Sequence, residues 1–370
     1  MAGSKWISKG RAHQYYSPLY QASAVDDDDL NPEEYGLPSK LLSDTSLHTV
    51  PPRNLLRGSM SSFIFKLWVF LLGLGCTKVF QENSSRNTPS TYVVSNEPKE
   101  ISYRITRGLD IVVSHYSEDL ESLNAFMSGL ESIPKLNDLK PNLIIYTKNN
   151  ASDISKIKDM AGASEVIVLP NEGREAATYF HHIIQRWDDL ANHTLFIQAD
   201  PHTPDRALGR LRSYFEPGRT GMLDLGFRDL RTCNCLDCID AFGWADEARL
   251  IPDLMAKAHH VQCDKDTKVS ISYKGQFIVS AKRTRSVQKS LYESLNSKLV
   301  GDHRIILGGD EDRLDAPVLG YTLERAWNVL FQCADQTGVR DMCPGLTLTS
   351  GAFLPDFRKP QPEDCGCLDT

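Results

Sequence analysis

The segment LPNEGREAATYFHHII, residues 169–184, combines a turn with residue types that bind anions. Gly173 allows a close backbone approach, and the free N–H groups of a first helical turn favour a negatively charged group. Arg174 can donate two parallel hydrogen bonds to a phosphate or a carboxylate. Asn171 is a residue type that favours the N-cap position. We therefore predict that Asn171, Gly173 and Arg174 bind a ligand, with His181, two turns further along, as an additional candidate.

The predicted helix in this segment has an apolar stripe and a polar face. The spacing of an amphipathic helix places six apolar side chains on one arc: Ala176, Tyr179, Phe180, Ile183, Ile184 and Trp187. Polar side chains lie opposite: Arg174, Thr178, His181, His182 and Gln185. The polar face has two interpretations, a solvent-exposed surface that carries spare histidines or a ligand site that starts at the first turn.

A second candidate site is the end of the apolar segment HTLFIQAD, residues 193–200. Carboxylates at a strand end can hold a divalent metal, which bridges diphosphate oxygens and offsets the charge of a leaving group. Here the triplet is Gln198-Ala199-Asp200, and an amide oxygen binds Mg²⁺ or Mn²⁺ less strongly than a carboxylate does. We predict Asp200 as a metal or ribose contact; the alternative is an Asp that caps a turn at the strand end.

These residues need elements that bring them together, and the sequence predicts an α/β fold. Apolar segments of strand length alternate with helical patterns, which favours right-handed crossovers and a mostly parallel central sheet flanked by helices. The predicted strands are residues 108–116, 142–148, 164–170 and 193–200. Ligands bind beyond the carboxyl ends of such strands. This rule selects residues 115–118, 146–148, 171–174 and 198–202. Further along, residues 272–286 fit a loop, a strand and a helix start, and residues 322–333 fit an amphipathic helix.

The N-terminal quarter of the 370-residue chain has a different composition. Residues 1–57 contain VDDDDLNPEEYG and predict a disordered cytosolic tail. Residues 59–80 are the one long apolar stretch, interrupted by Lys66, and predict a transmembrane signal anchor. Residues 81–98 are rich in Ser, Asn and Thr and predict a stem, followed by a domain over residues 99–370. The net charge of −7 argues against nucleic acid as a partner.

Two further patterns place the domain in the lumen of the secretory pathway. Three N-glycosylation sequons, at Asn83, Asn150 and Asn192, follow the apolar stretch, as do eight of the nine cysteines. The alternative is a cleaved signal peptide. The spacing of Cys235 and Cys238 also fits zinc, but a lumenal setting favours disulfides. Eight cysteines allow 105 pairings, and the sequence selects none of them.

Six segments carry a resemblance to a known family, in this order: DIVVSHYSEDLESL, LIIYTKN, VLPNEGREAATYFHHII, TLFIQADPH, YKGQFIVSAKRTRS and YTLERAWNVLF. Over about residues 105–335 the chain resembles a fungal family catalogued only as a domain of unknown function. More distantly, it is similar to GT-A-fold glycosyltransferases of polysaccharide synthesis. In some of these enzymes an Asn-x-Gly-Arg-Asp/Glu turn precedes the metal-holding strand, and residues 171–175 match that pattern. Gln198-Ala199-Asp200 departs from their Asp-x-Asp motif.

The resemblance implies a type II membrane protein of the Golgi or ER that transfers a sugar from a nucleotide-diphosphate donor. The acceptor would be a glycan, a glycolipid or a small hydroxylated molecule. Asn171, Gly173 and Arg174 would bind the diphosphate, and Asp200 would bind Mn²⁺ or Mg²⁺. An inverting enzyme needs a carboxylate base, for which Glu324 and Asp310, in the acidic loop 310–312, are the candidates. The alternative is a transferase-like protein that binds glycans or partners without catalysis. No Gly-x-Ser-x-Gly elbow or zincin helix supports a hydrolase.

Overall fold

The computed structural model describes residues 105–226, 232–240, 242–309, 312–334 and 362–369. They all lie in one compact unit of the chain, Asn96–Thr370. The predicted tail, signal anchor, stem and the sequon at Asn83 lie outside the described residues, so these remain predictions. Within the described residues no helix is both long enough and apolar enough to span a membrane.

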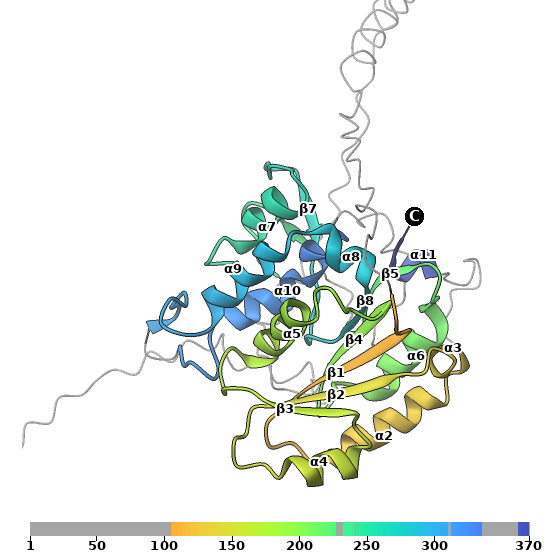
Figure 1. Cartoon of the computed structure of the whole chain (residues 1–370). Coiled ribbons are helices and arrows are strands. Elements are labelled where there is room, and N and C mark those ends of the chain that lie inside the picture. Colours follow the sequence, from red (N-terminus) through yellow and green to blue (C-terminus); the bar gives the residue numbers. More distant parts are fainter. Residues whose placement is uncertain (1–104, 227–231, 241, 310–311, 335–361, 370) are drawn as a thin grey trace, which may run out of the picture. The chain divides into compact units, whose positions relative to one another are not determined.

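A seven-stranded mixed sheet forms the centre of the domain, in the order β3-β2-β1-β4-β8-β5-β9 (Figure 1). Its strands are β1 (Leu109–His115), β2 (Asn142–Thr147), β3 (Glu165–Val168), β4 (His193–Gln198), β5 (Thr220–Asp224), β8 (Phe277–Ser280) and β9 (Cys367–Leu368). β1 pairs in parallel with both β2 and β4, and β2 pairs in parallel with β3. β8 is antiparallel to β4 and to β5, and β9 is antiparallel to β5. The α/β prediction is confirmed, and the sheet is mixed because β8 and β9 reverse the chain direction.

Helices cover both faces of this sheet (Figure 1). One face carries α2 (Leu120–Glu131), α3 (Pro134–Asn137), α4 (Ile154–Ala161) and α6 (Pro204–Tyr214). The other carries α5 (Arg174–Gln185), α7 (Leu250–Ala258), α9 (Lys289–Leu299) and α10 (Leu319–Leu330). Alternating side chains of the central strands feed the two cores: Val112 contributes to the α5 side, whereas Ile111 and Val113 contribute to the α2 side. This alternation follows from the two-residue period of a strand.

The remaining elements are short. A two-stranded sheet of β6 (Thr232–Asn234) and β7 (Lys268–Ser270) lies beside α7, and α8 (Ala281–Ser286) continues directly from β8. Close to the C-terminus, α11 (Pro362–Cys365) precedes β9. The carboxyl ends of β1, β2 and β4 share one edge of the sheet, because these strands are parallel. The antiparallel β8 starts at that same edge, since Phe277 pairs with Phe196 near the end of β4.

Candidate functional site

The predicted ligand turn, residues 171–174, joins β3 to α5 at this carboxyl edge. Gly173 and Arg174 both have left-handed backbone conformations, with φ values of 68° and 50°. The Gly173 amide donates to the carbonyl of Leu314 at 2.8 Å. A Cβ at Gly173 would lie 2.7 Å from the Ala177 Cβ and 2.8 Å from a methyl group of Val300. Both the positive φ and this close packing require glycine here.

Asn171 does not act as the helix cap that its residue type predicted. The N-cap of α5 is Gly173, and no side chain donates or accepts a capping hydrogen bond there. The reason is geometric: the chain reverses through Gly173 and Arg174, so the helix begins two residues later than an Asn171 cap requires.

Arg174 lies against the start of α10. Its guanidinium stacks on the Tyr321 ring, with 4.2 Å between the Cζ atom and the ring centroid, and its Nε donates to the carbonyl of Pro317 at 3.3 Å. Its side chain also fills the space beside Gly320, where an added Cβ would lie 2.5 Å from the Arg174 Cδ. Among the described residues, no group bonds to the two terminal guanidinium nitrogens. These nitrogens are free to bind an anion in a forked geometry.

Lys148, directly after β2, supports the same turn from within the protein. Its side chain is buried, and its Nζ donates to the carbonyl of Glu172 at 2.6 Å and to the carbonyl of Arg174. No carboxylate of the described residues lies within salt-bridge distance of this ammonium group. Burial lowers the pKa of Lys148 to about 8, and the charges of Glu175 and Glu172 oppose that shift. The sequence placed Lys148 at the ligand edge, but it gave no sign of this contact.

Two carboxylates meet at a second turn, Lys274-Gly275, which leads into β8. Glu324 of α10 accepts the Lys274 amide on Oε1 at 2.7 Å. The carboxylate of Glu175 of α5 packs against Gly275, where an added Cβ would lie 2.9 Å from the Glu175 Oε1. Burial and the nearby charge of Glu324 raise the pKa of Glu175, while Arg174 and Lys148 act in the opposite direction. The sequence identified Glu324 but not its pairing with Glu175.

Asp200 lies just beyond β4 and is exposed. Gln198 is half-buried, and the backbone amide of His202 donates to the Gln276 side chain at 3.1 Å. Within the described ranges, no three His, Cys, Asp or Glu side chains come together in a group that could hold a metal ion. The metal contact of Asp200 therefore remains a prediction.

Two of the five residues on the polar face of α5 are buried against the sheet, whereas Gln185 is exposed. Thr178 and His182 are fully buried; Thr178 lies 3.1 Å from the Ser114 hydroxyl, and His182 Nδ1 lies 3.0 Å from the Tyr146 hydroxyl. Both contacts face strands of the sheet, so α5 is packed on two sides. Burial lowers the pKa of His182 to about 4. His181 is half-buried beside the Tyr146 ring and lies outside the contacts of the ligand turn.

The acidic loop divides into two parts. Asp310 and Glu311 lie outside the described residues, so a catalytic role of Asp310 is untested. Asp312 is buried, accepts the amides of Leu307 at 2.6 Å and Val318 at 3.0 Å, and pairs with Arg304 at 3.1 Å. These contacts hold the loop that supplies Leu314 and Pro317 to the ligand turn.

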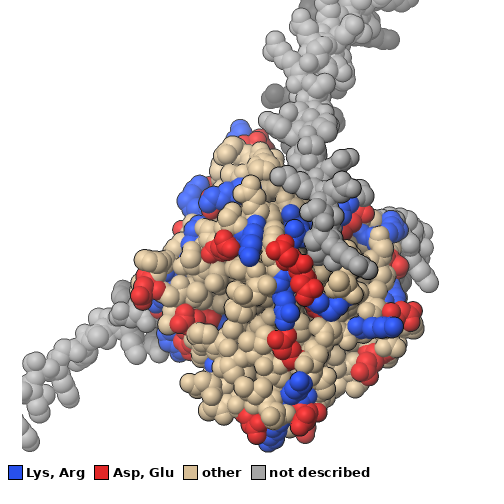
Figure 2. Space-filling view, viewed as in Figure 1, with Lys and Arg blue, Asp and Glu red and all other residues tan. Residues whose placement is uncertain are grey.

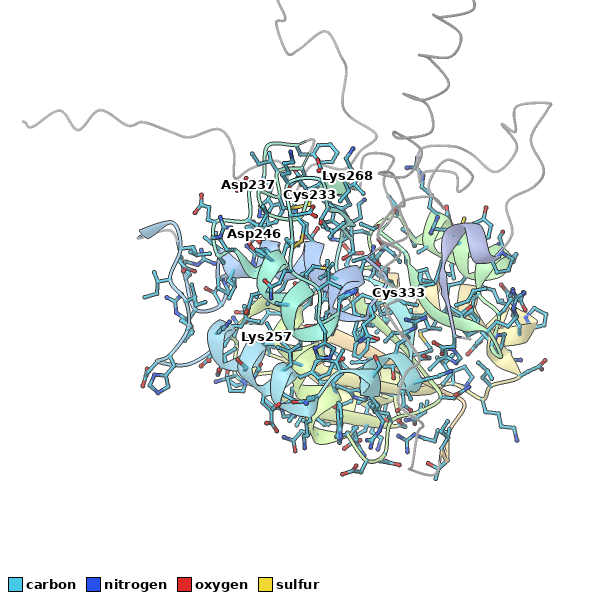
Figure 3. The ribbon with its side chains drawn as sticks, turned by 90° about the horizontal axis from the view of Figure 1, so that it is seen from above. Cys233, Asp237, Asp246, Lys257, Lys268 and Cys333 are labelled. Carbon is cyan, nitrogen blue, oxygen red and sulfur yellow. A yellow bond between two sulfur atoms is a disulfide. The ribbon has the colours of Figure 1, made fainter. Side chains whose placement is uncertain are left out.

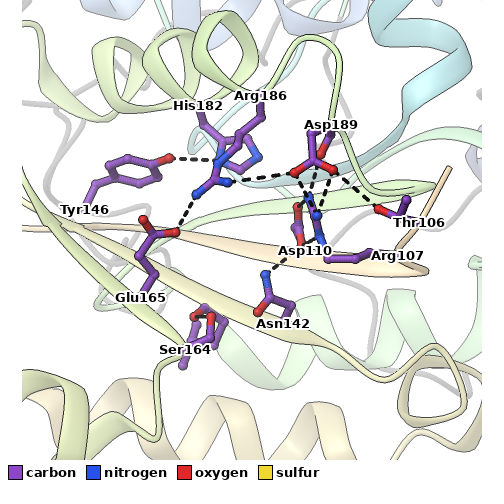
Figure 4. Close-up of polar contacts among 11 residues, drawn as sticks. Thr106, Arg107, Asp110, Asn142, Tyr146, Ser164, Glu165, His182, Arg186 and Asp189 are labelled. Atoms are coloured by element: carbon purple, nitrogen blue, oxygen red, sulfur yellow. Dashed lines mark hydrogen bonds and ion pairs between the residues drawn. The ribbon is translucent and has the colours of Figure 1, made fainter. Parts of the chain in front are cut away.

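The opposite edge of the sheet is closed by ion pairs (Figure 4). Asp110 is fully buried and accepts two hydrogen bonds from Arg107, both at 3.0 Å, and one from Asn142 at 2.9 Å. Arg107 also bonds to Asp189, and Arg186 bonds to Glu165. Because these charged groups satisfy one another, this edge is a structural network, and Arg174 lies at the other edge.

The cysteines form disulfides, as expected for an oxidising compartment. The pairs are Cys233–Cys238, Cys235–Cys263 and Cys333–Cys367, and Cys365 is also disulfide-bonded. Cys235 and Cys238, whose spacing fits zinc, belong to two different bridges. Figure 3 labels Cys233 in the β6–β7 region and Cys333 nearer the C-terminal elements. Of the two sequons within the described residues, Asn150 is exposed in a turn and Asn192 is half-buried.

Basic and acidic side chains are interspersed on the face shown in Figure 2, with no continuous basic patch over it. This distribution agrees with the acidic net charge of −7. The candidate site is therefore a local feature of the carboxyl edge, formed by Arg174, Lys148, Glu175 and Glu324.

Comparison with known proteins identifies the family. Residues 111–346 match the family described as "Protein of unknown function (DUF3431)". The chain belongs to this family. The match includes the ligand turn, both candidate carboxylates and Lys148, so the candidate site lies wholly inside the family domain. No curated protein matches the chain.

Two solved structures show a weak likeness. The first is glucosyl-3-phosphoglycerate synthase from Mycobacterium tuberculosis in complex with Mn²⁺, uridine diphosphate and glucosyl-3-phosphoglycerate, with 15% identity and a TM-score of 0.24. The alignment covers 48% of this chain and 58% of that enzyme. The second is core-mannan synthase A from Aspergillus fumigatus in its Mn/GDP form, with 14% identity, a TM-score of 0.25, and coverage of 62% and 72%. Both scores are too low for an argument about function.

Proposed function

We propose that this protein is a glycosyltransferase that moves a sugar from a nucleotide-diphosphate donor to a glycan, a glycolipid or a small hydroxylated acceptor. The observation that supports this best is the placement of an anion-binding group beside a carboxylate. Arg174 stacks on Tyr321, and Glu324 is three residues further along the same helix. Residues three apart share a helix face, about 5–6 Å between Cβ atoms. A nucleotide-sugar whose diphosphate is bound to Arg174 would therefore place its sugar near the carboxylate of Glu324, the proposed base.

Glu324 has the properties that proton acceptance requires. Its Oε1 accepts the Lys274 amide, whereas its Oε2 lies 4.0 Å from the nearest nitrogen of Arg325, and its side chain is 18% exposed. In the proposed step the acceptor hydroxyl gives its proton to Glu324, and its oxygen bonds to the anomeric carbon. The bond from that carbon to the diphosphate breaks, and its electron pair leaves with the nucleoside diphosphate, which Arg174 binds.

Binding of nucleoside diphosphates to the purified full-length chain tests this proposal. We expect UDP or GDP to bind and to raise the melting temperature. Loss of one or two charge-assisted hydrogen bonds, about 1.5–3 kcal/mol, predicts that Arg174→Ala weakens this binding by roughly 10- to 100-fold. Arg186→Ala is the matched control, because Arg186 follows the same helix at its other end and bonds to Glu165. Its folded form should bind the nucleotide as the unchanged protein does.

A second candidate function is glycan or partner binding without catalysis. The triplet Gln198-Ala199-Asp200 favours it, because an amide stands where the related transferases carry the first carboxylate of Asp-x-Asp. If no nucleoside diphosphate binds, with or without Mn²⁺, the transferase proposal fails and the binding function is preferred. If the protein slowly hydrolyses a donor sugar and Arg174→Ala stops this reaction, the non-catalytic function fails.

We also propose that the domain is lumenal, in the Golgi or ER, behind the predicted signal anchor. The disulfides support an oxidising compartment. Asn150 is the better placed of the two described sequons, because it is exposed. Expressed in a eukaryotic cell, the protein should lose one glycan-sized mass step on Asn150→Gln. An unglycosylated protein that migrates unchanged after endoglycosidase treatment would contradict lumenal placement.

A further inference from the structure

Lys148 is the buried cation closest to the ligand turn, and the proposed reaction does not use it. It lies at the carboxyl end of β2, whereas the turn belongs to the β3–α5 connection. The two segments meet through the Nζ group, which bonds to the carbonyls on either side of Gly173. A single ammonium group therefore spans the two residues that have left-handed backbones, Gly173 and Arg174.

Those two backbone conformations need support from their surroundings. A non-glycine residue such as Arg174 at a φ of 50° costs free energy and persists only when neighbouring contacts fix it. The contacts that fix the turn include the Gly173 amide bond to Leu314 and the two bonds from Lys148, beside the Arg174 Nε bond to Pro317 and the Gly301 amide bond to Glu172. The bond to Leu314 positions the turn from the α10 side, and the bonds from Lys148 position it from the sheet side.

We propose that Lys148 is a positioning residue for donor binding, which orders the ligand turn and supplies positive charge beneath it. This inference rests on the proposed function, because it assumes that the turn binds the diphosphate. Lys148 does not touch the donor; it acts through the carbonyls of Glu172 and Arg174. A charged ammonium donates stronger hydrogen bonds to a carbonyl than a neutral amine does, so the effect depends on its protonation.

The charged groups around Lys148 set how that protonation responds to a ligand. Glu172 and Glu175 favour the ammonium form, and burial opposes it strongly enough to place the pKa of Lys148 at about 8. Arg174 is a second cation close to Lys148, and Glu324 is a further carboxylate close to Glu175. A bound diphosphate adds negative charge next to this group. Binding should therefore raise the pKa of Lys148, and the complex should take up a proton near pH 8.

The experiment is calorimetric titration of the full-length chain with UDP and GDP at pH 7, 8 and 9, in buffers of different ionisation enthalpy. The unchanged protein should take up a fraction of a proton near pH 8 and bind more weakly at pH 9. Lys148→Met should weaken binding by about tenfold or more at pH 7, because charge-assisted bonds are lost. The affinity of Lys148→Arg at pH 9 should be within about threefold of its affinity at pH 7, since an arginine stays charged there.

Lys156→Met is the matched control, because Lys156 is an exposed lysine eight positions further along the chain, in α4. It should leave affinity and proton uptake unchanged, and the ionisation of the nucleotide itself is common to every variant. The inference fails if the nucleotide binds but Lys148→Arg shows the proton uptake of the unchanged protein, or if Lys148→Met binds equally well while melting cooperatively. If no nucleotide binds to the unchanged protein at any pH, the proposed function fails instead. A Lys148→Met variant that does not fold leaves Lys148→Arg and its proton uptake as the deciding measurement.

Discussion

At the scale of single residues, Glu175 interacts electrostatically with both the cation Lys148 and the carboxylate Glu324. Burial and the Glu324 charge together outweigh Arg174 and Lys148, so the pKa of Glu175 is raised. A carboxyl group whose pKa is higher in the folded state binds its proton more tightly there than in the unfolded chain. Its contribution to stability is therefore present below the unfolded-state pKa and is lost as the pH rises through the folded-state pKa.

This sign predicts the behaviour of Glu175→Gln, which resembles the protonated side chain in shape and charge. Near pH 4 the melting temperature of the variant should equal that of the unchanged protein. At pH 8 the variant should melt at a higher temperature, because Glu175 ionises more readily in the unfolded chain than in the folded protein, which destabilises the unchanged protein. Thermal denaturation across this pH range measures the difference. A Glu175→Gln variant that is less stable at pH 8 than at pH 4, relative to the unchanged protein, would show that its charge stabilises the fold.

At the scale of elements, local patterns predicted the strands and helices well where packing agrees with periodicity. The predicted strands at 108–116, 142–148, 164–170 and 193–200 correspond to β1, β2, β3 and β4. The predicted helix within residues 322–333 is α10, which begins earlier at Leu319. The apolar stripe of α5 is buried as predicted, and Ile184 and Trp187 pack on the edge of that core.

The order and direction of the strands, and the polar contacts between elements, could not be predicted from local sequence patterns. The order of strands places β8 between β4 and β5, and nothing in the segment FIVS states which neighbours it pairs with or in which direction. Solvent exposure was one of two interpretations of the polar face of α5, but Ser114 and Tyr146 offer Thr178 and His182 partners from the sheet. Periodicity reports where a side chain lies on its own helix and says nothing about polar partners on another element.

In the candidate site, too, local sequence predicted the turn, whereas the contacts between distant residues came only from the structure. The composition of the turn NEGRE predicted an anion-binding segment, because Gly and Arg have local physical reasons to be there. The contact of Lys148 with Glu172 spans 24 residues, and that of Lys274 with Glu324 spans 50. Contacts over such separations depend on the register of whole elements. The family resemblance predicted Glu324 as a candidate base, and the structure adds the turn Lys274-Gly275 and the second carboxylate, Glu175, beside it.

At the scale of the whole molecule, disulfides join segments that the sheet alone does not hold. Cys333 follows α10, and its bond to Cys367 ties the two-residue strand β9 to that helix. β9 also receives support from Arg283, which bonds to the Leu368 carbonyl at 2.5 Å and to Asp369 at 3.0 Å. The edge of the sheet next to β5 is therefore closed by one covalent bond and one buried arginine.

Loop length predicts how much each bridge contributes to stability. Cys333–Cys367 closes a separation of 34 residues, and Cys233–Cys238 closes one of 5 residues. The chain-entropy relation assigns about 4 kcal/mol to the longer loop and about 2 kcal/mol to the shorter one. Denaturant unfolding of the double variants Cys333→Ser/Cys367→Ser and Cys233→Ser/Cys238→Ser measures both values, and each serves as the control for the other. Since β9 covers the edge of β5, the first pair should also increase amide exchange in β5, whereas the second should not. Equal losses of stability from the two pairs, with β5 protected in both, would show that β9 is held by Arg283 and its backbone pairing rather than by the bridge.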